Sequence, residues 1–295
     1  MDNTINFLGA RRVCFSVSVA LIAVGLGVLL LKGGPSLGID FRGGVHIVAT
    51  LTEPADPDQV ADAVEAAGID RPKVVAAADN VLLIDASADK PGVGQQIVEA
   101  VGKAFPLKTG GVEINEVGAN VGQDLQIAGI LMIVVSLGLL LIYISLRFEW
   151  RFAVAAIAAI VHDVLIVLCV FTALNLEINL PTLAAFLTVV GYSINDTIVV
   201  FDRIRENRRL MRGVRYLDLI NASVTQTLSR TLLTSLTTFF VVALIFWQSV
   251  AGELRTFSLA LVFGIVVGTY SSIYIASPIV LALRPKARYA AAKPS

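Results

Sequence analysis

The sequence predicts an α-helical polytopic membrane protein with six transmembrane helices and one small α+β, ferredoxin-like domain outside the bilayer. Of its 295 residues, 56% are hydrophobic and 16% are charged, and the mean hydropathy is +0.78. Soluble domains carry about 25% charged residues, so this balance is typical of a membrane protein. A single long polar stretch, between the first two apolar runs, alternates strand and helix patterns.

Six apolar runs are each close to the ~20 residues that a helix needs to cross a bilayer. The predicted spans are 13–31, 126–146, 152–173, 181–201, 230–247 and 257–283. The first run is longer than the apolar core of a signal peptide and no small-residue cleavage pattern follows it, so we expect it to remain as an anchor.

Arginines predict which side of the membrane each loop faces. The loops 174–180 and 248–256 hold only Arg255. The other arginines near span ends are Arg11, Arg12, Arg147, Arg151, Arg203, Arg205, Arg208, Arg209, Arg212, Arg215, Arg284 and Arg288. By the positive-inside rule, residues 1–12, an arginine-rich loop at 202–229 and residues 284–295 are expected to be cytoplasmic, which puts residues 32–125 outside.

The predicted outer domain, residues 32–125, is acidic, with 14 Asp and Glu against 7 Lys and Arg. Its patterns follow the order β-α-β-β-α-β, which matches a split βαβ, ferredoxin-like domain. The expected elements are a strand at 43–51, a helix at 57–67, a hairpin of strands 73–78 and 81–86, a helix at 92–105 and a strand at 111–117. We find no spacing in it that catalysis would need, so we expect a binding or lever surface.

Five glycines, at 33, 34, 38, 43 and 44, surround Asp40 and Arg42 just after the first span. A phosphate-binding loop would need a strand before the glycines and a helix after them, and neither is expected here. A tight turn where the chain leaves the membrane is the better interpretation.

Asp196 lies inside the apolar fourth span, and Arg230 opens the fifth. A charge at the centre of a bilayer costs about 2.5 to 3.5 kcal/mol even on the most lenient scale, so such residues usually mark ion or proton paths. The alternative is that Asp196 partners the arginine-rich loop and that Arg230 extends to the interface. An aspartate whose arginine partner moves can take up and release a proton, so this pair is our first candidate site.

A polar stripe at spacings of three and four residues follows the fifth span. It comprises Ser223, Thr227, Arg230, Thr234 and Thr237. Exposing such a stripe to lipid is energetically unfavourable, so we expect it to face other helices or a water-filled cavity. Helix packing and a water path both remain open for its hydroxyl groups.

His162 and Asp163 lie near the middle of the third span and form a second possible relay. Adjacent side chains on a helix point in different directions, so they need not act together, and a structural hydrogen bond is an equal alternative for His162. The chain has no His-x-x-x-His or Glu-x-x-His spacing, so no metal and no cofactor are expected. In the sixth span, Gly264, Gly268 and Ser272 predict a face on which another helix packs closely.

Several motifs in this order resemble the SecF family of bacterial protein export, a relative of the RND transporter superfamily. They are Gly38 to Gly44, with Asp40, Phe41, Gly43 and Gly44; Val161 to Asp163; Gly191 to Thr197 and Phe201 to Asn207; Thr227 to Thr234; and Gly268 to Ser272. Asn195 followed by Asp196 is similar to SecF rather than to SecD.

The resemblance implies a multi-pass subunit of the bacterial plasma (inner) membrane that acts with SecD. Its implied role is to couple the proton-motive force to outer-face stages of polypeptide translocation, as an accessory subunit and not an enzyme. The expected partners are SecD, the Sec translocation channel, the unfolded polypeptide and membrane lipid, with no nucleic acid. Asp196 and Arg230 match the positions that the family uses for proton coupling.

Two alternatives belong to other classes of protein. An RND-type exporter of small molecules or lipids would share the membrane layout, but an outer segment of about 94 residues gives little room for a ligand cleft. An intramembrane hydrolase would need an activated nucleophile, for which Ser193 is the nearest candidate.

Overall fold

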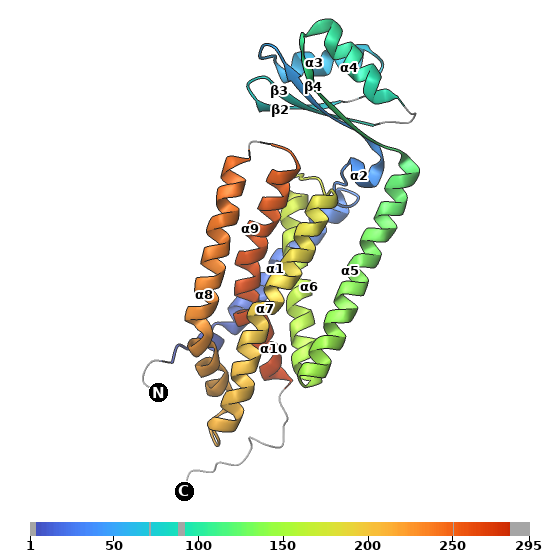
Figure 1. Ribbon diagram of the computed structural model, residues 1–295. Helices are drawn as coiled ribbons and strands as arrows, with labels where there is room; N and C mark the ends of the chain where they lie inside the picture. Colours follow the sequence, from blue (N-terminus) through green and yellow to red (C-terminus); the bar gives the residue numbers. More distant parts are fainter. Residues whose placement is uncertain (1–3, 71, 88–91, 250, 284–295) are drawn as a thin grey trace.

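The computed structural model describes residues 4–70, 72–87, 92–249 and 251–283. Long helices form a bundle, and a small α+β domain lies over one end of it (Figure 1). The six helical spans that the sequence predicts are all present, with the additional β-sheet domain, so the predicted fold class is confirmed.

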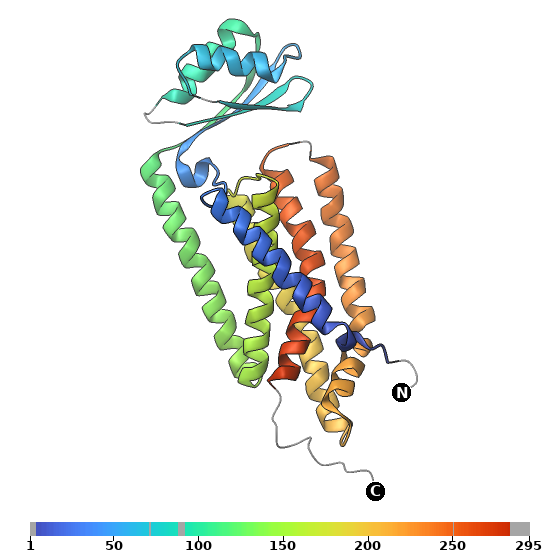
Figure 2. The same ribbon diagram turned by 180° about the vertical axis from the view of Figure 1, so that it is seen from behind.

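The bundle consists of six helical runs long and apolar enough to cross a membrane. They are α1 (Arg11–Leu31), α5 (Ala119–Arg147), α6 (Trp150–Ala173), α7 (Leu180–Leu210), α8 (Tyr216–Gln248) and a last run made of α9 (Glu253–Ser271), the π-helical η2 (Ser272–Ala276) and α10 (Ser277–Ala282). A short 3₁₀ turn, η1 (Phe7–Gly9), precedes α1. The chain enters α1 and leaves α10 at the end of the bundle away from the outer domain (Figure 2).

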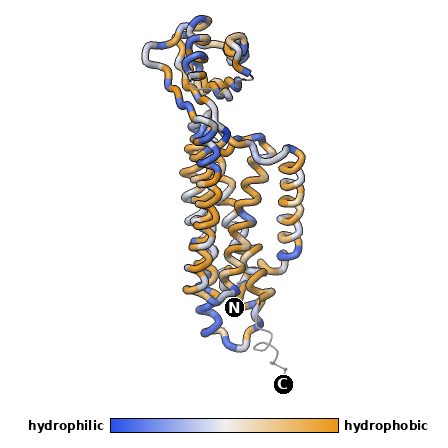
Figure 3. Tube along the Cα trace, turned by 90° about the vertical axis from the view of Figure 1, so that its right-hand side faces the viewer, coloured by the Kyte–Doolittle hydropathy of each residue, from blue (hydrophilic) through white to orange (hydrophobic). Residues whose placement is uncertain are grey.

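Helices α6, α7 and α9 form the interior of the bundle. About half of the residues in their most apolar stretches are buried, against 11% in α1 and α5 and 17% in α8. Helix α1 runs diagonally across the back of the bundle, and α5 and α8 lie at its two edges (Figures 1 and 2). The bundle is mostly hydrophobic along its length, and hydrophilic residues gather at its ends (Figure 3). The outer helices therefore present apolar surface to lipid or to a partner chain.

The segment expected to be an arginine-rich loop, 202–229, is almost entirely helical. Helix α7 continues to Leu210 and α8 already begins at Tyr216, which leaves only residues 211–215 between them. Hydropathy ends a predicted span where apolar residues stop, but a helix continues wherever one face is buried, and here Ile204 and Leu219 are completely buried. Similarly, α5 starts at Ala119, inside the segment assigned to the outer domain.

The outer domain has the predicted β-α-β-β-α-β order. Its elements are β1 (Gly44–Leu51), α3 (Pro57–Ala66), β2 (Lys73–Ala78), β3 (Val81–Ala86), α4 (Val93–Ala104) and β4 (Leu107–Val117). The strands form one antiparallel sheet in the order β2-β3-β1-β4. The two helices cover the face of the sheet that points away from the bundle (Figure 1). Buried aliphatic residues fill the space between the helices and the sheet, among them Ile47, Val64, Ile84 and Ile97.

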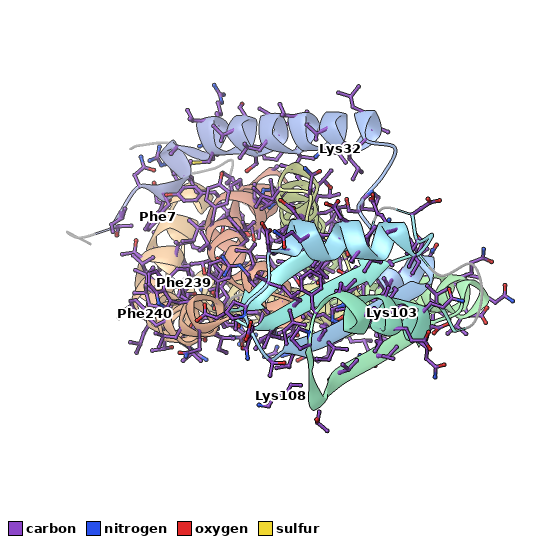
Figure 4. All side chains as sticks on the ribbon, turned by 90° about the horizontal axis from the view of Figure 1, so that it is seen from above. Phe7, Lys32, Lys103, Lys108, Phe239 and Phe240 are labelled. Carbon is purple, nitrogen blue, oxygen red and sulfur yellow. The ribbon has the colours of Figure 1, made fainter. Side chains whose placement is uncertain are left out.

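Both connections between the outer domain and the bundle leave from the same place in the sheet. Gly44, the first residue of β1, pairs with Val117, the last residue of β4, and β4 continues through Gly118 into α5. Seen from above, the outer domain overlies part of the bundle, while α1, which ends beside Lys32, runs along one side (Figure 4). The domain is thus joined to the bundle by two neighbouring strands.

Candidate functional site

Asp196 is buried in the bundle, where it links three helices. Its side chain lies on α7 and the residue is 2% exposed. Ser235 of α8 donates a hydrogen bond of 3.2 Å to Asp196 Oδ2, and the Ser235 hydroxyl is 2.7 Å from Thr269 Oγ1 on α9. The carboxyl group is therefore held in a water-poor site in contact with the fifth span, as a coupling residue requires.

Arg230 lies on α8 five residues before Ser235 and is exposed at the surface of the single chain. Its charge acts on Asp196, but no ion pair joins the two side chains within the described part of the chain. The pair expected from the sequence is therefore on facing helices without direct contact. A small movement of α8 relative to α7 would change the interaction between the two charges.

Asp163 is the centre of a second buried cluster. The residue is 1% exposed, and its Oδ2 accepts hydrogen bonds from Ser193 of α7 at 2.5 Å and Ser271 of α9 at 2.7 Å. Its Oδ1 is 2.8 Å from Nδ1 of His162, the preceding residue on α6. The expectation that adjacent side chains on this helix point apart is wrong here, because both fold towards the bundle interior, where buried polar groups need partners.

The His162 ring stacks on Tyr270 of α9, with the ring centres 6.2 Å apart. Its Nε2 is buried without a hydrogen-bond partner among the described residues. The hydroxyl oxygens of Tyr192, Thr197 and Thr231 are also buried without a hydrogen-bond partner among the described residues. In proteins, such groups usually bind water, so these four atoms mark positions where water can enter the bundle.

The face that α8 turns to the bundle differs from the predicted stripe. Ser223, Thr227, Thr231 and Ser235, at strict four-residue steps, are the buried hydroxyl residues. Thr234 is half-buried and Thr237 is exposed, and each donates to a carbonyl one turn earlier on its own helix. Of the predicted stripe, the single chain buries Ser223 and Thr227 and leaves the later residues half-buried or exposed, because steps of three and four residues describe two adjoining helix faces equally well.

The two carboxylate clusters share α7 and α9. On α7, Ser193 is hydrogen-bonded to Asp163 and Asp196 is hydrogen-bonded to Ser235. Ser193 and Asp196 are three residues apart, which is about 4.5 Å along the helix axis. Close contact between α7 and α9 makes this possible. A Cβ on Gly264 would collide with Val189, and one on Gly268 would lie 3.1 Å from Ser193 Cβ.

Ser272, the third residue of the predicted packing face, is buried but begins the π-helical turn η2. Its hydroxyl donates to the carbonyl of Thr269 at 2.9 Å and its own carbonyl accepts from Ser277 at 2.9 Å. The last span therefore changes its helical period just after the Asp163 cluster, as π turns often do near functional sites.

The glycine-rich motif outside the first span forms a joint between the outer domain and the bundle. Residues Ile39–Arg42 make one turn of helix, α2, where the sequence predicted no helix. Asp40 Oδ2 accepts a 2.8 Å hydrogen bond from the backbone N–H of Leu180, at the start of α7. Its negative charge therefore stabilises the N-terminus of the helix that carries Asp196.

Phe41 is buried at the top of the bundle against α6 and α7, and its carbonyl accepts from Gln126 Nε2 of α5 at 2.6 Å. Gly43 and Gly44 have φ angles of 79° and 149°, which favour glycine, and a Cβ on Gly44 would lie 2.7 Å from the Ala86 carbonyl oxygen. The motif therefore connects the first strand of the outer domain to α5 and α7 through hydrogen bonds and close packing around α2.

The buried polar groups gather around the two carboxylates. Ser193 donates its hydroxyl hydrogen to Asp163 Oδ2, and His162 Nδ1 lies beside Oδ1 of the same carboxylate. Within the part of the chain that the structure describes, no three His, Cys, Asp or Glu residues come together as a metal site. The groups available are two carboxylates, one imidazole and a set of hydroxyls.

Six helices able to span a membrane, two buried carboxylates between them and one small α+β domain at one end of the bundle define a polytopic membrane protein with a single folded domain outside its helical bundle. Residues 97–286 match the family model described as "Protein export membrane protein SecD/SecF, C-terminal", and residues 28–55 match the "SecD/SecF GG Motif" model. The chain belongs to the SecD/SecF family of protein-export membrane proteins, which confirms the resemblance seen in its motifs.

Relatives match the chain over nearly its whole length. The "Protein translocase subunit SecF" of Vibrio alginolyticus is 44% identical over 96% of this chain and 90% of its own length. The SecF of Pseudomonas aeruginosa is 38% identical over 94% of this chain and 91% of its own. The "Protein translocase subunit SecDF" of Thermus thermophilus is 38% identical over 96% of this chain, but the match spans only 39% of that longer protein.

Two solved structures resemble this one. The crystal structure of SecDF from Thermus thermophilus, described as a translocon-associated membrane protein, superposes with a TM-score of 0.84 at 36% identity, over 95% of this chain and 39% of that one. A SecDF crystal structure described as the super-membrane-facing form gives a TM-score of 0.71 over 96% of this chain and 39% of that one. The structure described here is closer to the first.

Proposed function

We propose that this chain is the SecF-type subunit of a bacterial protein-export machinery and that it uses proton movement to drive its outer domain. Near-complete matches to relatives named as SecF support this role. In the SecDF relative, the region that matches this chain makes up 39% of the relative's own length, which supports SecD as a partner. We expect the complex to lie in the plasma membrane with both chain ends in the cytoplasm and the outer domain beside the emerging polypeptide.

The observation that carries the proposal is Asp196, buried on α7 and hydrogen-bonded to Ser235 of α8, with Arg230 five residues earlier on α8 and not in an ion pair with it. Ionisation of a buried carboxyl changes the helix arrangement that is most stable, since a charged carboxylate attracts the guanidinium and a neutral carboxyl does not. Moving one proton through about 100 mV supplies about 2.3 kcal/mol, enough to bias a two-state equilibrium nearly fiftyfold.

Asp196 is connected to the outer domain through α7. The same helix begins at Leu180, whose N–H is bonded to Asp40 in the joint below the sheet. A tilt or shift of α7 is therefore transmitted to α2 and to β1, which follows it. In this mechanism α7 carries the proton site near its middle and contacts the joint of the outer domain at its N-terminus.

Asp196→Asn tests the coupling directly, because asparagine keeps the shape and can still accept from Ser235 but cannot ionise. We expect export of a reporter protein in membrane vesicles to lose its dependence on the proton gradient, while co-purification with SecD is unchanged. Asp202→Asn is the matched control, because that carboxylate lies on the same helix in an exposed ion pair with Arg147. If export by the Asp196→Asn variant depends on the proton gradient as strongly as export by the Asp202→Asn control, the assignment is refuted.

A further inference from the structure

A basic cavity lies at the end of the bundle opposite the outer domain and takes no part in the coupling path. It has a volume of about 420 Å³. Its lining comes from the start of α6, the end of α7, the connection to α8 and α10, and includes Arg151, Arg205, Arg208, Arg209 and Arg212. The single acidic residue in the lining, Glu149, forms a 2.9 Å ion pair with Arg208.

The arginines of this cavity differ from the others at the same end of the bundle. Outside the cavity, Arg203 and Arg215 pair with carboxylates three residues further along their helices, at 2.6 Å and 2.7 Å. In contrast, Arg151, Arg209 and Arg212 have no carboxylate within ion-pair distance among residues 4–70, 72–87, 92–249 and 251–283. The cavity thus concentrates positive charge that the described chain does not neutralise.

The floor of the cavity is apolar. Phe152, Tyr216 and Val280 are 2%, 5% and 2% exposed and belong to the buried core of the bundle. A cavity lined by several arginines and by buried Phe152 and Val280 fits a molecule with a phosphate and an attached hydrocarbon part. Guanidinium groups bind phosphate oxygens through paired hydrogen bonds.

The depth of the cavity agrees with this chemistry. Trp150, at the start of α6, is 59% exposed, and the Arg151 guanidinium lies 5.5 Å from the centre of its ring. Exposed tryptophans gather at the level of the lipid headgroups, so Arg151 of the cavity lies where phosphates of a bilayer are found.

We propose that this cavity binds a phosphate group, and that its source is the headgroup of an anionic phospholipid. The test uses the full-length chain in detergent with Trp247→Phe, which leaves Trp150 as the one tryptophan and a reporter beside the site. Dioctanoyl phosphatidylglycerol, dioctanoyl phosphatidylcholine and inorganic phosphate are titrated separately while Trp150 fluorescence is recorded. We expect saturable binding of phosphatidylglycerol, weaker binding of inorganic phosphate and no saturation with phosphatidylcholine.

Arg209→Gln with Arg212→Gln removes two exposed cavity arginines, and Arg203→Gln with Arg215→Gln removes the same charge outside it. We expect the first variant to bind phosphatidylglycerol about thirtyfold more weakly, from about 1 kcal/mol for each arginine and about 1.4 kcal/mol for each tenfold change. The control should stay within about threefold of the parent. If inorganic phosphate binds as tightly as phosphatidylglycerol and depends equally on Arg209 and Arg212, the anion site is supported, but its ligand is free phosphate and not a lipid. Equal loss in both variants, or equal binding of phosphatidylcholine, would overturn the proposal.

Discussion

Replacing Gly264 by alanine should separate the two helices that hold both carboxylate clusters. The nearest atoms to a Cβ at Gly264 are Cγ2, Cγ1 and Cβ of Val189, a residue that is 1% exposed. Overpacking a tight interior costs about 1 to 3 kcal/mol, and we expect about 3 kcal/mol here because Val189 has little room to move. Alanine recovers about 1 kcal/mol of helix propensity. The net loss of stability is then about 2 kcal/mol.

A double-mutant cycle isolates this contact. Val189→Ala alone should cost about 2 kcal/mol from lost burial, and it removes the atoms that the new methyl group would meet. The double variant should therefore lose only about 1 kcal/mol, about 3 kcal/mol less than the sum of the single variants. Gly191→Ala is the matched control, because it lies on α7 with nothing within 4 Å of its Cβ, and it should be stabilised by about 1 kcal/mol.

Thermal unfolding of the full chain in detergent measures all four variants, with shifts of about 2 to 4 °C for each kcal/mol in a domain of 150–250 residues. Additive losses for Gly264→Ala and Val189→Ala would refute the reasoning. A Gly264 variant as stable as the Gly191 variant would refute it as well.

Two further predictions concern the outer domain and its joint. A 2.5 Å hydrogen bond to Asp85 on the neighbouring strand raises the pKa of His46 above its ordinary 6.5. The stabilisation is therefore complete below pH 6.5 and is lost as pH rises through the folded pKa. The protection factor of the β1 amides, which compares their exchange rate with that of a free peptide at the same pH, should fall between about pH 6 and 8, and Asp85→Asn should flatten this fall. Gly122→Ala should destabilise the joint by about 1 to 3 kcal/mol, because its Cβ would lie 2.9 Å from the Phe41 carbonyl oxygen, a main-chain atom that cannot rotate away.

Each of these has its own control. A protection factor in β1 that does not change between about pH 6 and 8 in the parent chain would contradict the role of His46. For the joint, Gly138→Ala places the same change on α5 with nothing within 4 Å, and equal melting temperatures for the Gly122 and Gly138 variants would contradict the tight contact.

The sequence predicts the fold class and the buried charges well because both depend on large energies. Six apolar runs and a β-α-β-β-α-β pattern define the elements, and Asp163 and Asp196 are conspicuous because a carboxylate in an apolar run is costly. Their partners were not predicted. Ser235, Thr269 and Ser271 have the same composition as ordinary packing residues, and only the packing of α7, α8 and α9 shows which hydroxyl faces a carboxylate.

The remaining differences arise where local pattern does not determine orientation. Spacing could not separate the face of α8 that carries Thr231 from the adjoining face that carries Thr234. Hydropathy could not show that residues 202–210 continue a helix, since polar residues are compatible with both loop and helix. The helix turn at Ile39–Arg42 is too short to have a period, and it depends on contacts with α5 and α7.

The chain connects the outer domain to the bundle through β1 and β4, which pair with each other at Gly44 and Val117, and an exposed ion pair between Lys73 and Glu177 adds a contact at β2. Two separated attachments would resist bending in most directions, whereas two adjacent strands act as a single pivot line. Rotation about that line leaves the ladder between the strands intact, but twisting the domain about its long axis would shear the bonds that join them. The attachment therefore favours rotation of the outer domain about this line over twisting about its long axis.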